Sequence, residues 1–219
     1  MTDYEIKKIT INDPLYPPLL KEINNPPKQL YYVGKFPEVN LFPLAIVGSR
    51  QSDKYGEDSL SYLLSAEILD KTLIISGLAR GIDTKAHLLA HHTIAVLGTG
   101  LDKASFYPPE NWALCQSIVD RGGLVISEYA PGTKANYFHF PQRNRIIAGL
   151  SQAVLVVQAK KRSGALITAR LALEDGRDVL AVPGPIFNEL SLGVNQLIAQ
   201  GAIPITSPDD LKQCLTENS

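Results

Sequence analysis

Residues 44–50 read LAIVGSR, a short aliphatic run that is followed at once by glycine, serine and arginine. Such a run, apolar at every position, is typical of a strand with helices on both faces. Similar runs occupy residues 73–75, 94–97, 124–126, 153–157 and 179–182. Amphipathic stretches between and after them lie at residues 55–69, 82–91, 111–120, 143–150, 164–174 and 192–199. This alternation predicts an α/β fold with a doubly wound, mostly parallel sheet.

The first 43 residues differ from the rest, because they contain seven of the 15 prolines. Proline fixes φ and removes an amide donor, so we expect an irregular or short-helical lead-in. Apolar residues such as Tyr16, Leu20 and Leu30 are too frequent for a free tail, so this segment should pack on the rest. We therefore divide the chain into a lead-in, residues 1–43, and a main domain, residues 44–219.

The composition excludes several classes of protein. The chain has 219 residues, of which 45% are hydrophobic and 20% charged, close to ordinary globular values. It contains no apolar run long enough to span a membrane, and its charged first residues lack a signal core. Cys115 and Cys214 form no CxxC pair, so we expect buried packing thiols and a reducing cytoplasm.

Charge is unevenly distributed along this nearly neutral chain, whose net charge is −1. Residues 129–173 contain no aspartate or glutamate. Their basic residues are Lys134, Arg143, Arg145, Lys160, Lys161, Arg162 and Arg170. A segment of one sign indicates a surface for an anionic partner, although a chance distribution is the alternative.

Small residues and arginines follow the predicted strands. Gly48, Ser49 and Arg50 follow the first, and Ser163 and Gly164 precede a predicted helix. Ligands of an open α/β sheet bind beyond the carboxyl ends of its strands. Glycine and serine let backbone amides approach a phosphate, and a helix N-terminus adds unpaired N–H groups. The pattern favours phosphate binding, with tight βα turns as the alternative explanation.

Aromatic residues accompany the basic ones. Tyr137, Phe138 and Phe140 lie between Lys134 and Arg143. Aromatic faces interleaved with cations suit the stacking of unpaired bases, and we expect Phe140 or a neighbour to do this. We also expect either Phe138 or Phe140 to lie in the core.

Sequence signals for other chemistry are weak. Neither GxGxxG after a strand nor GxxxxGK[ST] occurs, and no glutamate completes a zinc motif around His87 and His91. Asp83 is expected to cap the helix that follows it. We predict no catalytic residue, metal or cofactor. The rival hypothesis is a nucleotide-binding enzyme or sensor, with Asp83 or Glu128 as its acid–base group.

Several motifs, in chain order, resemble those of the DNA-processing protein A (DprA/Smf) family. They include IVGSR at 46–50, SGLARGID at 76–83, SEY at 127–129, FPQRNRIIAGL at 140–150, SGALITAR at 163–170 and AVPG at 181–184. The resemblance implies an extended Rossmann-like domain that binds single-stranded DNA, forms a homodimer and is not chiefly an enzyme. It also implies that a RecA-type recombinase is loaded onto incoming DNA in natural transformation.

The resemblance also suggests which residues bind DNA. We expect phosphate contacts from Arg50, Lys134, Arg143 and Arg145. The other expected site residues are Gly48, Ser49, Phe140, Asn144, Ser163 and Gly164. Members usually have an acidic residue where this chain has Gln158, which is a departure from the family pattern. Members often carry a helical domain before the core and a winged-helix domain after it; we expect the core alone.

Overall fold

A computed structural model describes residues 4–37 and 40–217. Their strands form one sheet in the order β1-β2-β6-β5-β4-β3-β7-β8-β9. The strands are β1 (Lys7–Thr10), β2 (Gln29–Gly34), β3 (Phe42–Val47), β4 (Thr72–Ser76), β5 (His92–Leu97), β6 (Leu124–Ser127), β7 (Ala153–Val156), β8 (Asp178–Ala181) and β9 (Ile203–Pro204). Neighbours from β6 through β9 in that order are parallel, whereas β1–β2 and β2–β6 are antiparallel. The predicted doubly wound, mostly parallel sheet is confirmed.

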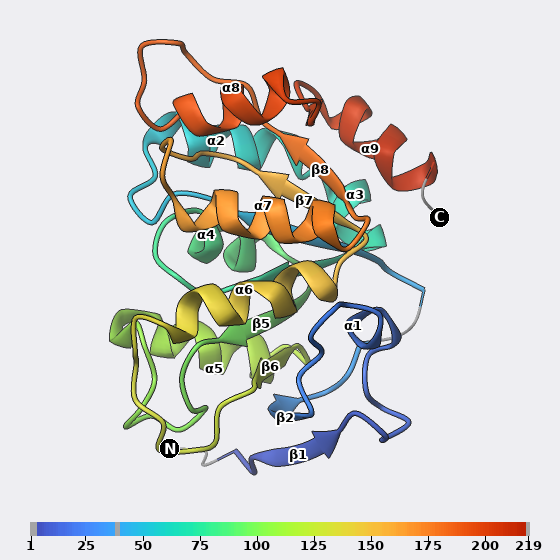
Figure 1. The fold of residues 1–219 in the computed structure, drawn as a ribbon, viewed down its shortest axis with the longest axis vertical. Coiled ribbons are helices and arrows are strands. Elements are labelled where there is room, and N and C mark those ends of the chain that lie inside the picture. The colour runs from blue at the N-terminus through green and yellow to red at the C-terminus, as the bar shows by residue number, and fades with distance from the viewer. Residues whose placement is uncertain (1–3, 38–39, 218–219) are drawn as a thin grey trace.

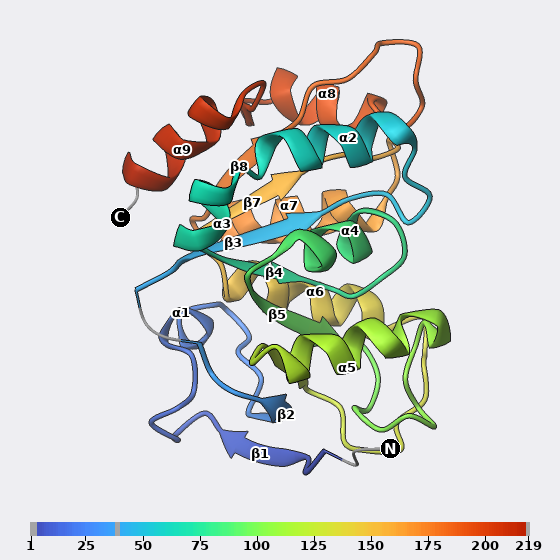
Figure 2. The same ribbon diagram turned by 180° about the vertical axis from the view of Figure 1, so that it is seen from behind.

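Helices cover both faces of the sheet (Figures 1 and 2). On one face lie α1 (Pro18–Lys21), α6 (His139–Gly149), α7 (Gly164–Glu174) and α8 (Leu192–Ala199). On the other lie α2 (Lys54–Leu63), α3 (Ala66–Lys71), α4 (Ile82–Leu89), α5 (Trp112–Asp120), preceded by the 3-10 turn Pro109–Asn111, and α9 (Pro208–Glu217). Because the parallel strands all run in one direction between two helical layers, the loops that follow them lie together beyond their carboxyl ends.

The aliphatic runs form strands because their side chains fill two cores at once. In β3, Ala45 and Val47 join the core under α6 and α7, whereas Leu44 and Ile46 join the core under α2 and α4. Alternate side chains of a strand point to opposite faces, so a fully buried strand must be apolar throughout. All six predicted strands are present, with ends within two residues of those expected.

The lead-in is more regular than its prolines indicate. Besides the short helix α1 it contributes β1 and β2, which extend the sheet beyond the last parallel strand, β6. Its residues Tyr16 and Leu30 are buried in the core under α6. The Tyr16 hydroxyl donates a hydrogen bond to the carbonyl of Pro27 at 2.7 Å. The prolines lie outside both strands, which is why they do not prevent pairing.

Two predicted helices have different limits in the structure. The stretch 55–69 divides into α2 and α3, because Leu64 leaves the helical region at φ −88° and ψ 71°. The helix expected at 143–150 begins earlier, at His139. Pro141 is tolerated there because the first turn of a helix has no intrahelical partner for its N–H groups. The elements β9 and α9 were not expected.

Candidate nucleic-acid interface

A pocket opens where the strand order of the sheet reverses. The chain passes from β3 outward through β4, β5 and β6, and later from β7 outward through β8 and β9 on the other side. Arg50 follows β3, and Arg162 follows β7. The pocket between these loops has a volume of about 590 Å³ and is lined by both residues. Ligands of open α/β sheets bind at such a reversal point.

Most of the predicted site residues meet in this pocket. Its lining includes Gly48, Ser49, Arg50, Phe140, Arg143, Asn144, Ser163 and Gly164. Lys134 is exposed on the loop between β6 and α6, outside the lining. Arg145 also lies outside it, and its Nη2 donates to the two carboxylate oxygens of Glu128 at 2.7 and 2.9 Å. A phosphate would therefore have to compete with the Glu128 carboxylate for the Arg145 guanidinium.

Arg143 is the buried cation of the pocket. Its residue is 4% exposed, and its Nη1 donates to the carbonyl of Val96 at 2.7 Å. Its Nε has no partner among the described residues. A Cβ placed on Gly77 would lie 1.7 Å from Nη1, so only glycine fits beside this guanidinium. Burial lowers the pKa of Arg143 to about 10, which leaves it charged at neutral pH.

Asp83 does not cap α4, contrary to the sequence expectation. The helix begins after Gly81, whose φ of +71° favours glycine. The Asp83 carboxylate instead accepts hydrogen bonds from the amides of Gly77, at 3.2 Å, and Ala79, at 3.4 Å. Burial raises the pKa of Asp83, although the nearby Arg143 acts in the opposite direction. Asp83 thus fixes the loop that lies against Arg143.

Arg50 and Phe140 are in contact in the pocket. The guanidinium carbon of Arg50 lies 5.2 Å from the centre of the Phe140 ring, a cation–π arrangement. The Phe140 ring also lies 5.8 Å from that of Tyr107. Phe138 is 69% exposed and Phe140 is half-buried in the pocket wall, so the expectation that one of them is a core residue is wrong. Both rings are available to a ligand.

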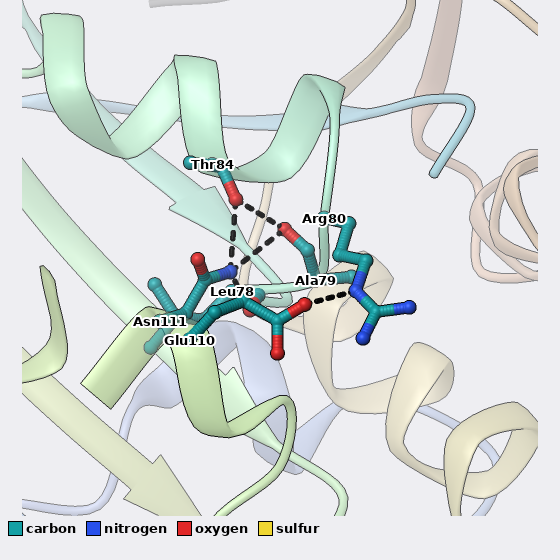
Figure 3. A network of polar contacts seen from close by, with 6 residues as sticks. All are labelled: Leu78, Ala79, Arg80, Thr84, Glu110 and Asn111. Atoms are coloured by element: carbon teal, nitrogen blue, oxygen red, sulfur yellow. Dashed lines mark hydrogen bonds and ion pairs between the residues drawn. The ribbon is translucent and has the colours of Figure 1, made fainter. Parts of the chain in front are cut away.

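A polar network supports the loop between β4 and α4 (Figure 3). The side-chain nitrogen of Asn111 donates to the carbonyls of Leu78, at 2.9 Å, and Ala79, at 3.3 Å, and to the Thr84 hydroxyl at 2.9 Å. Leu78 has a positive φ of 52°, which a leucine adopts only under such restraint. Arg80 at the end of this loop pairs with Glu110. Sequence reasoning missed Asn111 and Glu110.

Gln158 organises the neighbouring loop. It is buried, and its Nε2 donates to Asp53 Oδ1 at 2.7 Å. The same carboxylate caps α2 through the amide of Gly56 and accepts from Asn188 Nδ2 at 2.8 Å. Burial alone would raise the pKa of Asp53, but the bonds from Asn188, Gly56 and Gln158 hold it below its usual value. An amide at position 158 therefore meets a carboxylate as a donor, which an ionised acid could not do.

The pocket is strongly basic. Five cationic side chains line it against a single carboxylate, that of Asp83, and the cations are Arg50, Arg80, Arg143, Lys160 and Arg162. Arg80 pairs with Glu110 and Lys160 with Glu189, but Arg50 and Arg162 form no ion pair within the described chain. Lys160 and Arg162 lie in the segment 129–173, which has no acidic residue. The charge pattern of the sequence therefore pointed to them, although the list of expected site residues did not include them.

The first turn of α7 adds amide donors to this positive surface. Ser163 precedes the helix, and its hydroxyl oxygen is buried without a partner among the residues described. Asn144 Nδ2 donates to the carbonyl of Gly164 at 3.2 Å and fixes this helix start against α6. A helix N-terminus beside several arginines is suited to a phosphate.

His87 lies in α4 and His91 just after it, and each has a partner within the described chain. His87 is fully buried and contacts the Thr93 hydroxyl through Nδ1 at 2.8 Å. His91 pairs with Asp70 at 2.7 Å. Across residues 4–37 and 40–217 there is no cluster of three or more metal-ligating side chains. Within the same residues, none of the helices has the length and apolar character that a membrane span requires.

A family comparison bears on the basic pocket. The family described as DNA recombination-mediator protein A matches residues 7–216. This chain belongs to that family. The DNA processing protein DprA of Streptococcus pneumoniae is 46% identical over 206 residues, which are 92% of this chain and 72% of that protein. Protein Smf of Escherichia coli is 42% identical over 211 residues, which are 94% of this chain and 56% of that protein. The family resemblance read from the motifs is confirmed.

Solved structures of the family share the fold. The X-ray structure of DNA processing protein A from Streptococcus pneumoniae matches with a TM-score of 0.88 at 44% identity, over 95% of this chain and 74% of that one. DNA processing protein A from Helicobacter pylori matches with a TM-score of 0.84 at 27% identity, over 98% of this chain and 99% of that one. The latter structure describes a single-stranded DNA binding mode. The Rossmann-like fold expected from the family is confirmed.

Proposed function

We propose that this protein is a recombination mediator that holds single-stranded DNA in the basic pocket between β3 and β7. The observation that carries the proposal is the set of five cations facing one carboxylate at the reversal point of the sheet. Membership of the recombination-mediator family supports it. So does the single-stranded DNA binding mode described for the Helicobacter pylori relative.

The phosphates of the strand would be held by two kinds of donor. Arg50 and Arg162 are exposed, without ion pairs among the described residues, and suited to the bidentate recognition of phosphate oxygens. The amides around Gly48, Ser49 and Gly164 would bind others. Arg143, with an unpartnered Nε on the pocket wall, would supply the buried positive charge. Lys134 and Arg145 stay predictions as outer contacts.

Preference for a single strand would come from stacking. Phe140 presents a half-buried ring beside Arg50, and an unpaired base can lie on such a ring whatever its sequence. A duplex cannot offer that face without unstacking. Phosphate contacts alone would carry little sequence information, so the protein would bind single strands of any base sequence.

The biological role would follow from binding rather than from chemistry. A homodimer in the cytoplasm would hold the incoming strand during natural transformation and place a RecA-type recombinase on it. In this role the protein is not an enzyme and needs no metal or cofactor. Its activity would then be to place the recombinase on the strand, and it would catalyse no reaction.

Fluorescence anisotropy with a labelled oligo-dT, single-stranded and in duplex form, tests the proposal. We expect tighter binding to the single strand and faster assembly of a recombinase on strands that carry the protein. Equal or absent binding to both forms at low salt would contradict it. A mononucleotide provides the control for the rival hypothesis: at about 100 times its Kd it would add about 2.7 kcal/mol to the unfolding free energy, measured by thermal shift.

A further inference from the structure

The loop between β8 and α8, residues 182–191, carries the most exposed aromatic side chain among the large hydrophobic residues of the described chain. Phe187 is 95% exposed, and its neighbour Ile186 is 71% exposed. The loop projects at the upper left of Figure 1, ahead of α8. An apolar tip of this kind on a soluble surface indicates a contact that the free protein lacks.

The loop is held in place at its base, so the exposure of its tip is not the result of fraying. Asn195 contacts both backbone groups of Gly184, donating to the carbonyl at 2.9 Å and accepting from the amide at 3.2 Å. The Tyr55 hydroxyl donates to the carbonyl of Pro183 at 2.6 Å. These partly buried hydrogen bonds fix the base of the loop, so Phe187 is presented to solvent on a fixed support.

A second hollow, lined by Phe187 and Asn188 among others, adjoins the basic pocket. Gln51 and Lys160 line both of them. Asn188, next to Phe187, donates to Asp53, which belongs to the loop that carries Arg50. A strand that leaves the pocket past Gln51 and Lys160 therefore meets the Phe187 ring.

We propose that Phe187 is a second stacking platform, which receives a base of the same DNA strand just outside the basic pocket. This inference rests on the proposed function and extends it. A pocket of about 590 Å³ is the size that holds one small ligand, so a longer strand must cross its rim. A phenyl ring on that rim stacks with any base and so lengthens the bound segment.

The charges beside Phe187 favour a nucleic acid over a protein partner. Lys160, Lys161 and Arg162 are consecutive and exposed. Glu189 pairs with Lys160 at 3.2 Å, and a phosphate arriving there would compete for that ammonium. The apolar part of the tip consists of two side chains, far less than the roughly 800 Å² that each partner buries in a stable protein interface.

A length series of oligo-dT, measured by anisotropy, tests the platform on the wild type and on Phe187→Ala, Phe187→Trp and Tyr62→Ala. Tyr62 is a matched control, because it is 62% exposed near the end of α2 and lines none of the hollows described. We expect Phe187→Ala to bind the shortest oligonucleotides normally. On longer ones it should bind about 5 to 140 times more weakly, the effect of losing one stacked base. Phe187→Trp should restore the binding, and Tyr62→Ala should match the wild type.

The outcomes separate the two proposals. If the wild type binds no oligonucleotide, the proposed function fails and the platform with it. If the wild type binds and Phe187→Ala matches it at every length, the platform alone is wrong. A loss that is equal at all lengths, or a change in oligomer mass by light scattering, would also overturn it. Crosslinking from 5-iodouracil placed along the strand should reach Phe187 from one position and Phe140 from another.

Discussion

The guanidinium of Arg50 lies over the ring of Phe140, 5.2 Å from its centre. The first residue follows β3 and the second belongs to α6, so the pair joins two elements across the mouth of the pocket. It places a cation over a flat aromatic ring. A nucleotide has a phosphate and a flat base, and this pair suits both.

Replacing Arg50 should weaken binding without harming the fold. If Arg50, Arg143, Lys160 and Arg162 each neutralise one phosphate, the logarithm of the binding constant should fall with that of the salt concentration at a slope of about −3. Arg50→Ala should make this slope shallower by about 0.7. The melting temperature should not change, because Arg50 is exposed. Unchanged affinity at equal stability would exclude Arg50 from the interface.

Gly77→Ala should damage both fold and binding. The new Cβ would lie 1.7 Å from Arg143 Nη1, and a guanidinium that is 4% exposed has little room to move. We expect a loss of about 1–3 kcal/mol in unfolding free energy, as for other overpacked sites, together with weaker DNA binding. Gly164→Ala is the control, since the nearest atom to its Cβ is Asn144 Nδ2 at 4.0 Å. Equal denaturation midpoints for the two variants would contradict this packing.

Glu110→Gln should strengthen binding. Glu110 pairs with Arg80, which lines the pocket, so loss of the carboxylate would free that guanidinium for a phosphate. The salt slope should steepen by about 0.7, the effect of one added phosphate contact. Asn111 would still hold the loop through Leu78 and Ala79. Weaker binding with an intact fold would mean that Glu110 positions Arg80 rather than restrains it.

Acid should destabilise the protein through His87. Burial, aided by the charge of Arg143, lowers the pKa of His87 to about 3, against 6.5 for the free side chain. Between these values the unfolded chain binds a proton that the folded chain does not, so stability falls as the pH drops below about 6.5. From pH 7 to pH 5 this group should contribute a loss of about 2 kcal/mol. Urea titrations of the wild type and of His87→Gln check it; equal pH dependence in the two would contradict it.

The sequence predicts the parallel strands well because burial on both faces leaves a local signature. In β3, every residue from Leu44 to Val47 is aliphatic and buried. The strand β2 has no such signature: Tyr31 and Tyr32 are only partly buried, since this strand lies near the sheet edge, and prolines precede it. A strand next to the sheet edge and among prolines is recognisable only once its partners β1 and β6 are known.

The candidate site likewise contains residues that the sequence identifies and contacts that it does not. Arg50, Phe140 and Ser163 could be named from motifs, because their position after a strand or before a helix is local information. The burial of Arg143 beside Gly77 and the support that Asn111 gives to Leu78 depend on contacts between distant segments. No spacing in the sequence encodes such contacts. The pairing of Arg145 with Glu128 was missed for the same reason.

Hydrogen–deuterium exchange, with and without bound oligo-dT, tests the central claim most directly, because it locates the strand on the protein. The claim predicts slower exchange in the loop after β3, residues 48–53, and around the start of α7, residues 160–166. It predicts no change in α9, which lines no part of the pocket. Protection confined to α9, or to any surface away from the β3 and β7 loops, would contradict the claim that the basic pocket holds the strand.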